Sequence, residues 1–206
     1  RQMCIRDSNN SLEDIEEVKL FGKDSISVIN PSSERMNTLR TTLHSGLLKN
    51  LDFNYRNGSP NTLIYEYGTV FEGKTDQLQD ISQKSSLSCL VHGDVFDRNV
   101  HFESISASFS FLKGVASNIF DDKKLGIKVN FKEENHHYCN PYYSIIDGKK
   151  QIIGGLGIIK ESLLKELDIA HKHEVVILDV DTKIFSDYRS YSTKVEDIIV
   201  FPIVSR

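Results

Sequence analysis

The chain has 206 residues, 39% of them hydrophobic and 26% charged, with a formal net charge of −4. This is an ordinary globular composition, and the length suits one domain or two small ones with a sizeable core. The slightly acidic balance argues against binding nucleic acid by bulk charge, and no apolar run approaches the roughly 20 residues that a membrane span needs.

The three cysteines, Cys4, Cys89 and Cys139, show no paired spacing. That usage fits a reducing cytosol better than a disulfide framework. No signal peptide is visible. We therefore expect a cytoplasmic protein that makes no contact with a membrane.

The first residues of the chain do not share the pattern of the rest. Residues 1–8, RQMCIRDS, are interpreted as non-native read-through. Residues 9–24 are interpreted as a linker or a partial upstream element, because Ser11 to Lys19 is acidic and polar and suits a linker or a frayed helix. The domain proper is predicted to cover 25–206 and to begin with a short strand over Ser25–Ile29.

The stretch from Asn30 to Gly73 predicts a capped helix, a break and a strand. Ser32 or Ser33 suits an N-cap, and Glu34 would face the positive end of the helix. Turn chemistry at 57–60, Asn-Gly-Ser-Pro, ends the helix. The helix is indicated by one apolar stripe: Met36, Leu39, Leu43, Leu47 and Leu51. The strand is indicated by alternation, with one face made of Ile64, Glu66, Gly68, Val70 and Glu72 and the other of Leu63, Tyr65, Tyr67, Thr69 and Phe71.

The middle of the chain predicts loops alternating with short elements. A polar loop over 74–86 precedes a strand over 87–91, and a charged loop follows over 94–101. A helical stripe comes next, followed by the alternation of a strand; the residues are Leu112, Val115, Ala116, Ile119 and Phe120, then Leu125, Ile127, Val129 and Phe131.

The last third is read mainly as strands. Asp147-Gly148 between apolar runs is the strongest hairpin signal in the chain. A helix over 163–167 and a buried strand over 174–180 come next, and an edge strand over 197–204 is interrupted by Pro202. Because strands outnumber helices, we predict an α+β domain with a mainly antiparallel sheet.

Seven short motifs, in order, carry a resemblance to a known family. They are Asn30-Pro31, Leu39-Arg40-Thr41-Thr42-Leu43, Leu47-Leu48, Tyr65-Glu66-Tyr67-Gly68-Thr69-Val70-Phe71, Phe111-Leu112-Lys113-Gly114-Val115, the glycine-rich segment 154–164, and Phe201-Pro202-Ile203-Val204-Ser205-Arg206. This set, from about Ser27 to Arg206, resembles the beta chain of bacterial phenylalanine–tRNA ligase. Lys113-Gly114 looks like that family's Lys-Gly helix start.

The resemblance implies a class II aminoacyl-tRNA synthetase-like sheet flanked by helices. It also implies a non-catalytic core of the beta subunit, which supports ATP-dependent attachment of phenylalanine to tRNA(Phe) by assembling with a catalytic alpha subunit in an alpha2-beta2 heterotetramer. ATP and Mg²⁺ would serve the whole enzyme, and none is expected on this chain. The family's first motif would precede Ser25, so we expect this chain by itself to expose an unpaired sheet edge and an apolar patch.

The phosphate-binding arginines of active class II synthetases are missing at the matching positions. Glu72 stands where the second motif has its arginine, and Val180-Asp181-Thr182 runs through the third motif. Arg40 can be read as a phosphate ligand or as a buried partner of a carboxylate such as Glu66, and the second reading is favoured. Gly154-Gly155-Leu156-Gly157 suits a tight strand-to-helix turn rather than a phosphate-binding loop. We therefore expect no catalytic and no cofactor-binding residue here.

The metal-ligating residue types also favour a structural reading. The one metal-like cluster is His136, His137, Cys139, His171 and His173. Without a Cys-x-x-Cys pair, in polar loop-like segments, we expect no metal site. The acidic pairs Asp121-Asp122 and Glu133-Glu134 are read as solvated edges.

Two other functions stay open at this stage. The chain could be a stand-alone binding or regulatory module derived from a synthetase, with a ligand in its vestigial pocket. A weaker alternative is a small independent ligase or metal-dependent hydrolase, which the missing arginines and the missing ligand spacing oppose.

Overall fold

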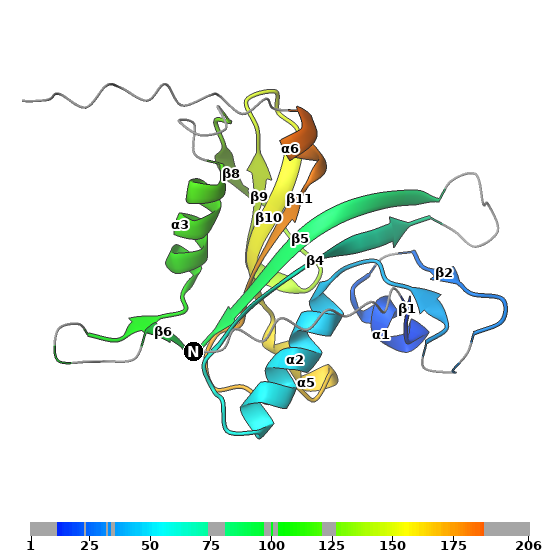
Figure 1. The fold of residues 1–206 in the computed structure, drawn as a ribbon, viewed down its shortest axis with the longest axis horizontal. Helices are drawn as coiled ribbons and strands as arrows, with labels where there is room; N and C mark the ends of the chain where they lie inside the picture. The colour runs from blue at the N-terminus through cyan, green and yellow to red at the C-terminus, as the bar shows by residue number, and fades with distance from the viewer. Residues whose placement is uncertain are drawn as a thin grey trace, which may run out of the picture.

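Antiparallel strands dominate the structure. In the described part of the chain they form a six-stranded sheet, a three-stranded sheet and a two-stranded ribbon, and every strand pair is antiparallel. Helices lie on both sides of the large sheet (Figure 1). The prediction of an α+β domain with a mainly antiparallel sheet is confirmed. The computed structural model describes residues 12–22, 24–31, 33, 36–73, 81–96, 100, 103–120 and 127–187.

The large sheet has the strand order β4-β5-β11-β10-β9-β8. The last of these strands in sequence, β11, lies between β5 and β10, so it joins the β4-β5 pair to the β9-β10 hairpin. The strands are β4 (Thr62–Glu72), β5 (Ser82–His92), β8 (Asn130–Glu133), β9 (Cys139–Ile146), β10 (Ile152–Ile159) and β11 (Val176–Asp181).

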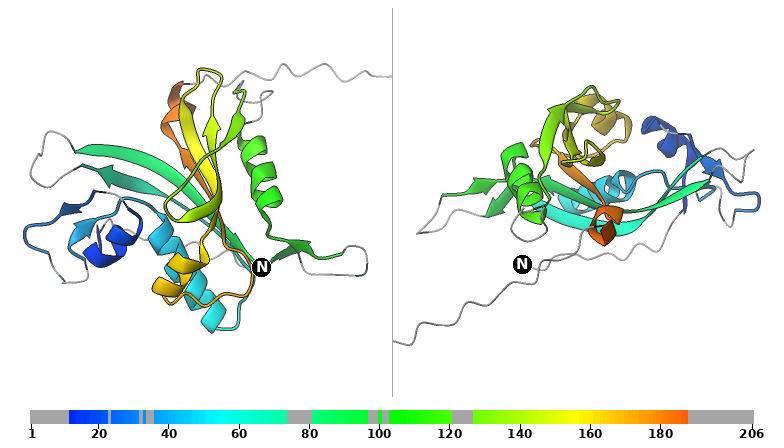
Figure 2. Two further views of the ribbon diagram at one scale, coloured as in Figure 1. Left: turned by 180° about the vertical axis from the view of Figure 1, so that it is seen from behind. Right: turned by 90° about the horizontal axis from the view of Figure 1, so that it is seen from above.

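Helices on the two faces of this sheet enclose two hydrophobic cores. Neighbouring residues of a strand face opposite cores, since strand side chains alternate. In β11, Ile177 belongs to the core under α2 and Leu178 to the core under α3. The predicted buried strand is therefore confirmed on both faces. Figure 2 shows the helices from behind: α2 (His44–Arg56) and α5 (Glu161–Glu166) on one side and α3 (Phe109–Ile119) on the other.

The predicted helix around the leucine stripe is right in its second half and wrong in its first. Thr38 and Leu39 form the short strand β3, which pairs with β1 and β2, and α2 begins only at His44. Thr42 Oγ1 accepts a hydrogen bond from the His44 backbone N–H, 3.2 Å away. Met36 is 37% exposed and lies outside the helix. Backbone pairing in the small sheet thus overrides the helical spacing of the first two apolar residues.

A small packed unit stands where a linker or a frayed helix was expected. The carboxylate of Asp14 caps α1 by accepting a hydrogen bond from the Glu16 backbone N–H at 3.0 Å, and Val18 is fully buried. Phe21 packs edge-on against Tyr138, with 5.1 Å between the ring centres. The predicted strand over 25–29 is present as β2. The unit consists of β1 (Leu12–Glu13), α1 (Ile15–Leu20), β2 (Ile26–Ser27) and β3 (Thr38–Leu39), and lies beside the long β4-β5 ribbon (Figure 1).

The β4-β5 ribbon is longer than the sequence predicted. The alternation in β4 is confirmed, with Ile64, Glu66 and Val70 buried on one face. β5, however, begins at Ser82, so the predicted loop is wrong over 82–86. That polar segment is a strand because it pairs with β4 as far as the Glu72–Ser82 register position, and not because of its own pattern.

The α3 region also departs from the prediction in detail. The stripe is confirmed, but Ser108 Oγ caps the helix at the Phe111 N–H, so Lys113-Gly114 lies inside the helix and not at its start. The expected charged loop over 94–101 contains the strand β6 (Asp94–Phe96), which pairs with β7 (Ile105–Ser106). Of the expected strand over 125–131, residues 127–129 lie outside any strand and β8 begins at Asn130, while 125 and 126 lie outside the described residues.

The Asp147-Gly148 hairpin is confirmed. Asp147 Oδ1 accepts hydrogen bonds from the backbone N–H groups of Lys149 at 2.9 Å and Gln151 at 2.8 Å. The short helix α5 forms where its leucines predicted it, and α6 (Lys183–Asp187) comes after β11. The predicted read-through at 1–8 and the predicted edge strand over 197–204 lie outside the described residues. No helix among the described residues has the length and apolarity to cross a membrane.

Candidate functional site

A cleft of about 200 Å³ opens on the sheet face that α2 covers. The segment that leads into α2 forms one wall, and residues of five strands, β4, β5, β9, β10 and β11, form the floor and the other walls. Part of the lining is apolar, and part carries hydroxyl and carboxylate groups. It consists of Thr41, Thr42, Leu43, Val70, Glu72, Lys84, Ser85, Ser86, Tyr142, Ile152, Ile153, Gly154, Gly155, Asp179 and Asp181.

Glu72 and Asp181, which the sequence resemblance aligns with the arginine-bearing motifs, both line this cleft. Glu72, from β4, pairs with Lys84 across the β4-β5 ribbon at 2.7 Å. Asp181, at the end of β11, accepts a hydrogen bond from the Lys183 backbone N–H at 2.9 Å. With Asp179, three carboxylates and one lysine line the cleft, and no arginine is among the lining residues. Such a lining repels a polyphosphate.

Asp179 is held by a buried polar network that the sequence analysis missed. His44 Nε2 lies 2.6 Å from Asp179 Oδ2, and Ser88 Oγ donates to Asp179 Oδ1. On its other side His44 Nδ1 lies 2.8 Å from the hydroxyl of Tyr138. Burial raises the pKa of Tyr138 well above its usual value, so its hydroxyl stays protonated and can donate to His44. Asp179 and Tyr138 thus lie against the two ring nitrogens of His44.

One sequence signal could have pointed to this network. Asp179 is an acidic residue between the buried apolar residues Leu178 and Val180. A buried strand tolerates such a residue only where partners satisfy it. The partner His44 comes from 135 positions earlier in the chain, so its identity depended on the tertiary structure.

The glycine-rich segment is not a strand-to-helix turn, and that prediction is wrong. Gly154 to Gly157 lie within β10. A Cβ atom on Gly155 would lie 2.0 Å from the Tyr142 hydroxyl oxygen, and one on Gly154 would lie 2.2 Å from the Asp179 carbonyl oxygen. Gly155 therefore leaves room for Tyr142 to lie across the sheet and form part of the cleft, whereas Gly154 leaves room for the backbone of β11. Burial, with a further contribution from Asp179, raises the pKa of Tyr142 to about 12.

Arg40 does not line the cleft. Its Nη1 lies 2.7 Å from Glu66 Oε1, and its Nε donates to the Thr69 carbonyl at 2.7 Å. The side chains of Arg40 and Glu66 are 8% and 9% exposed. The favoured reading, a buried arginine paired with Glu66, is confirmed. Gly68 makes room for the guanidinium, because a Cβ atom there would lie 2.2 Å from Nη2.

The metal-like cluster of the sequence divides into two separate groups. His136 stacks on Tyr142 with 4.1 Å between ring centres, beside a hollow of about 730 Å³ that Cys139 also lines. His171 Nε2 lies 2.8 Å from Glu161 Oε2, while the ring of His173 lies 5.7 Å from that of His92. Among the described residues, no three His, Cys, Asp or Glu side chains converge on a point that could hold a metal ion.

Burial keeps His136 and Cys139, the two residues beside the hollow, uncharged at neutral pH. Burial lowers the pKa of His136 to about 4 and raises that of Cys139 to about 12. At neutral pH the imidazole is therefore unprotonated, and the thiol is not a nucleophilic thiolate. Glu133 is exposed, and Glu134 accepts a hydrogen bond from Ser144 Oγ at 2.5 Å. The pair Asp121-Asp122 lies outside the described residues.

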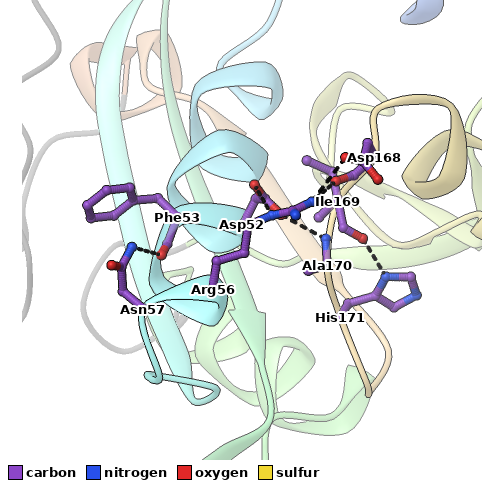
Figure 3. Close-up of polar contacts among 8 residues, drawn as sticks. All are labelled: Asp52, Phe53, Arg56, Asn57, Asp168, Ile169, Ala170 and His171. Carbon is purple, nitrogen blue, oxygen red and sulfur yellow. Dashed lines mark hydrogen bonds and ion pairs between the residues drawn. The ribbon is translucent and has the colours of Figure 1, made fainter.

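A polar clamp fixes the position of α2, and with it the wall of the cleft (Figure 3). Asp52 Oδ1 accepts hydrogen bonds from Arg56 Nε at 2.7 Å and from the Ala170 backbone N–H at 2.8 Å. Arg56 Nη2 donates to the Asp168 carbonyl at 2.7 Å. The clamp thus joins the second half of α2 to the segment between α5 and β11.

A comparison with known protein families shows to which family this chain belongs. The model of a family described as "Phenylalanyl tRNA synthetase beta chain CLM domain" matches residues 8–182. The chain belongs to this family. The match begins before the small N-terminal unit and so includes it.

Among curated relatives, this member of the phenylalanyl-tRNA synthetase beta chain family is similar to phenylalanine–tRNA ligase beta subunits. It is 26% identical to that of Buchnera aphidicola (subsp. Acyrthosiphon pisum) over 185 residues, which are 89% of this chain and 23% of the relative. It is 27% identical to that of Coxiella burnetii over 146 residues, 70% of this chain and 18% of the relative. The chain thus spans about a fifth of the length of these relatives.

A solved structure supports the fold. The pyrrolysyl-tRNA synthetase from Desulfitobacterium hafniense superposes with a TM-score of 0.57 over 82% of this chain and 54% of that one. The two sequences are 14% identical, so the likeness concerns the fold alone. A synthetase-like sheet is consistent with the class II arrangement that the sequence resemblance implied.

Proposed function

We propose that this chain is the non-catalytic, synthetase-like core of a phenylalanine–tRNA ligase beta subunit. In this role it supports ATP-dependent attachment of phenylalanine to tRNA(Phe) by assembling with a catalytic alpha subunit. The observation that carries the proposal is the meeting of Glu72 and Asp181 in one cleft, on the sheet face where an active synthetase would need cationic groups. Family membership names the enzyme to which such a core belongs.

Electrostatics supports the non-catalytic part of the proposal. A like charge at 4 Å costs about 4 kcal/mol at an effective dielectric constant near 20, where an arginine would gain a similar amount. The Glu72 and Lys84 charges compensate each other, so the carboxylates of Asp179 and Asp181 decide the sign of the cleft. Adenylate formation needs cationic groups where negative charge develops, and this lining offers a single lysine.

On this proposal, the aminoacylation reaction and its substrates belong to the whole enzyme and not to this chain alone. ATP, Mg²⁺ and phenylalanine would be bound by the alpha subunit in an alpha2-beta2 heterotetramer, in the cytoplasm, and tRNA(Phe) would be contacted by the assembled enzyme. The alternative of a stand-alone regulatory module is less well supported, because the matching relatives are about five times longer than the stretch they share with this chain.

Phenylalanine-dependent exchange of pyrophosphate into ATP tests the proposal. We expect no exchange from the purified chain, and exchange when a cognate alpha chain is present. A pull-down of the two chains should show a stable complex. Exchange by this chain alone would contradict the non-catalytic assignment, and failure to bind the alpha chain would favour the stand-alone alternative.

The variant Glu72→Arg provides the matched control. It restores one cationic side chain at the second-motif position, but leaves Asp179 and Asp181 in place. Because the phosphate-binding groups of such a site act together, we expect this variant to stay inactive. Activity in Glu72→Arg would instead mean that a single charge separates this core from a working synthetase site.

A further inference from the structure

One buried imidazole joins three segments of the chain where β5 ends. His92, the last residue of β5, is 0% exposed. Its Nδ1 lies 2.7 Å from the carbonyl oxygen of Pro60, in the turn between α2 and β4. Its Nε2 lies 3.3 Å from the backbone nitrogen of Lys172 and 3.2 Å from that of His173, in the segment between α5 and β11. The ring of Tyr55, in α2, packs edge-on against it with 5.8 Å between the ring centres.

These partners are compatible with only one protonation state of the ring. A carbonyl oxygen accepts and a backbone N–H donates, so Nδ1 carries the proton and Nε2 accepts from the two N–H groups. A second proton, on Nε2, would face both N–H groups, break both hydrogen bonds and place a positive charge in a buried site. We propose that His92 is a pH-sensitive latch, which holds residues 172–173 on the end of β5 while the ring is neutral and releases them when it is protonated. This inference goes beyond the proposed function and does not depend on it.

Burial is the main reason why the ring of His92 stays neutral. It lowers the pKa of this ring below the usual 6.5, and the carbonyl bound to Nδ1 offsets part of that effect. The titratable groups that face the ring come from the segment between α5 and β11 and from α2. His173 and His171 lower the pKa further, and Tyr55 packs against the ring, while the side chain of Lys172 is exposed. The surroundings therefore support the state that the hydrogen bonds require.

The rest of this segment is attached by contacts that protonation of an imidazole does not break. His171 Nδ1 lies 2.9 Å from the Ile169 carbonyl oxygen and Nε2 lies 2.8 Å from Glu161 Oε2, so both ring nitrogens face acceptors. The Ala170 backbone N–H donates to Asp52 of α2 at 2.8 Å (Figure 3). Protonation of His92 thus detaches residues 172–173 from β5 and leaves the clamp on α2 in place.

Acid favours release, because the released ring binds a proton more readily than the attached ring. Above pH 6.5 the imidazole of His92 is neutral in both states, and both hydrogen bonds to Nε2 are available. Below pH 6.5 the released imidazole takes up a proton that the attached ring, with its lowered pKa, still excludes. Each pH unit between these two pKa values raises the ratio of released to attached segment by about tenfold.

Hydrogen exchange at single amides, followed by NMR from about pH 7.5 to about pH 5, tests the proposal. The protection factors of the Lys172 and His173 amides should fall by up to about tenfold per pH unit below 6.5. Those of Ala170, bonded to Asp52, and of Ile177, in the central strand β11, should stay constant. Unchanged protection at Lys172 and His173 would overturn the proposal. A parallel loss at Ala170 or Ile177 would do the same, because the change would then not be confined to the latch.

Two variants assign the proton to one ring. In His92→Gln the side-chain amide can donate to Pro60 and accept from the two N–H groups, but it does not titrate, so the pH dependence should disappear. His173→Gln removes the exposed neighbouring imidazole and should leave the pH dependence in place. Persistence in His92→Gln, or loss in His173→Gln, would assign the proton to another group. In the wild type, the NMR titration of the His92 ring should have the same midpoint as the change in exchange at Lys172; different midpoints would refute the latch whether or not the variants fold.

Discussion

Glu13 is a carboxyl group buried where the N-terminal unit meets α2. It is 9% exposed, and burial raises its pKa from the usual 4.5 to about 7. The charged groups around it are Lys49 and Arg40, which lower the pKa, and Glu17, which raises it; Ser45 also lowers it through a hydrogen bond. Desolvation outweighs the two cations.

This shift predicts that stability falls as the pH rises. Below pH 4.5 Glu13 is protonated in both the folded and the unfolded chain. Between pH 4.5 and about 7 the unfolded chain releases the proton first, so the folded state loses up to about 3 kcal/mol relative to it. Denaturant melts of wild type and Glu13→Gln across this range check the prediction. The variant should lack this part of the pH dependence; parallel curves would refute the assignment to Glu13.

The buried pair Arg40–Glu66 predicts a cost for removing one partner. Glu66→Leu leaves a guanidinium buried without its carboxylate and should destabilise the fold by about 3–5 kcal/mol. Adding Arg40→Met in the same chain removes the stranded charge and should recover most of the loss. Chemical unfolding of both variants measures this. If the double variant were no more stable than Glu66→Leu, the loss would have to come from packing and not from charge.

At the scale of a single element, α2 has a buried face and an exposed face that differ sharply. Leu43, just before its first turn, is 1% exposed, and Leu47 is equally buried, whereas Phe53 is 62% exposed. The buried face packs on Ile64 and Leu90 of the sheet. This helix therefore holds one wall of the cleft through its apolar contacts as well as through the Asp52 clamp.

Truncation on the two faces of α2 should differ accordingly. Leu47→Ala leaves a cavity in the core and should cost about 2–5 kcal/mol. Phe53→Ala removes a larger side chain, but one in contact with solvent, and should cost less than about 0.5 kcal/mol. Urea unfolding of both variants provides the comparison. Similar losses in the two variants would mean that the buried face of α2 has been misassigned.

Considering the whole molecule, β4 is an edge strand of the large sheet. It is 11 residues long and pairs with β5 on one side. On the other side, Arg40 bonds to it at Thr69 and Phe71. Tyr65 and Tyr67 stand on the face away from α2 and are 45% and 65% exposed. Among the described residues, no strand pairs with this outer side of β4, and a long edge with aromatic side chains beside it is a template for association.

We therefore expect the isolated chain to self-associate as its concentration rises. Light scattering over a concentration series should show growing mass for the wild type. Tyr67→Lys, which places a charge beside the open edge, should reduce it. Ile29→Lys, at a residue 91% exposed in the N-terminal unit, makes the same kind of change elsewhere and serves as the control. A wild-type chain that stayed monomeric throughout would disprove the expectation.

The sequence by itself determined the helices, strands and turns whose signals come from residues close together in the chain. The β4 alternation, the α3 stripe and the Asp147-Gly148 hairpin are correct, because each depends on side-chain periodicity or turn chemistry within a few residues. The Arg40–Glu66 pair was also correct, since a buried arginine requires a carboxylate and the neighbouring strand supplied one. The family resemblance rested on the same local motifs.

Tertiary structure decided whatever depended on distant partners. β3 and the first residues of β5 are strands because other strands pair with them. Gly155 and Gly157 of β10 are glycines because Tyr142 packs where their side chains would lie. The cleft itself brings together residues from Thr41 to Asp181. The type of a residue shows whether it can be buried, charged or hydrogen-bonded. Which residue becomes its partner depends on backbone pairing and burial between distant parts of the chain, so only the folded structure determines it.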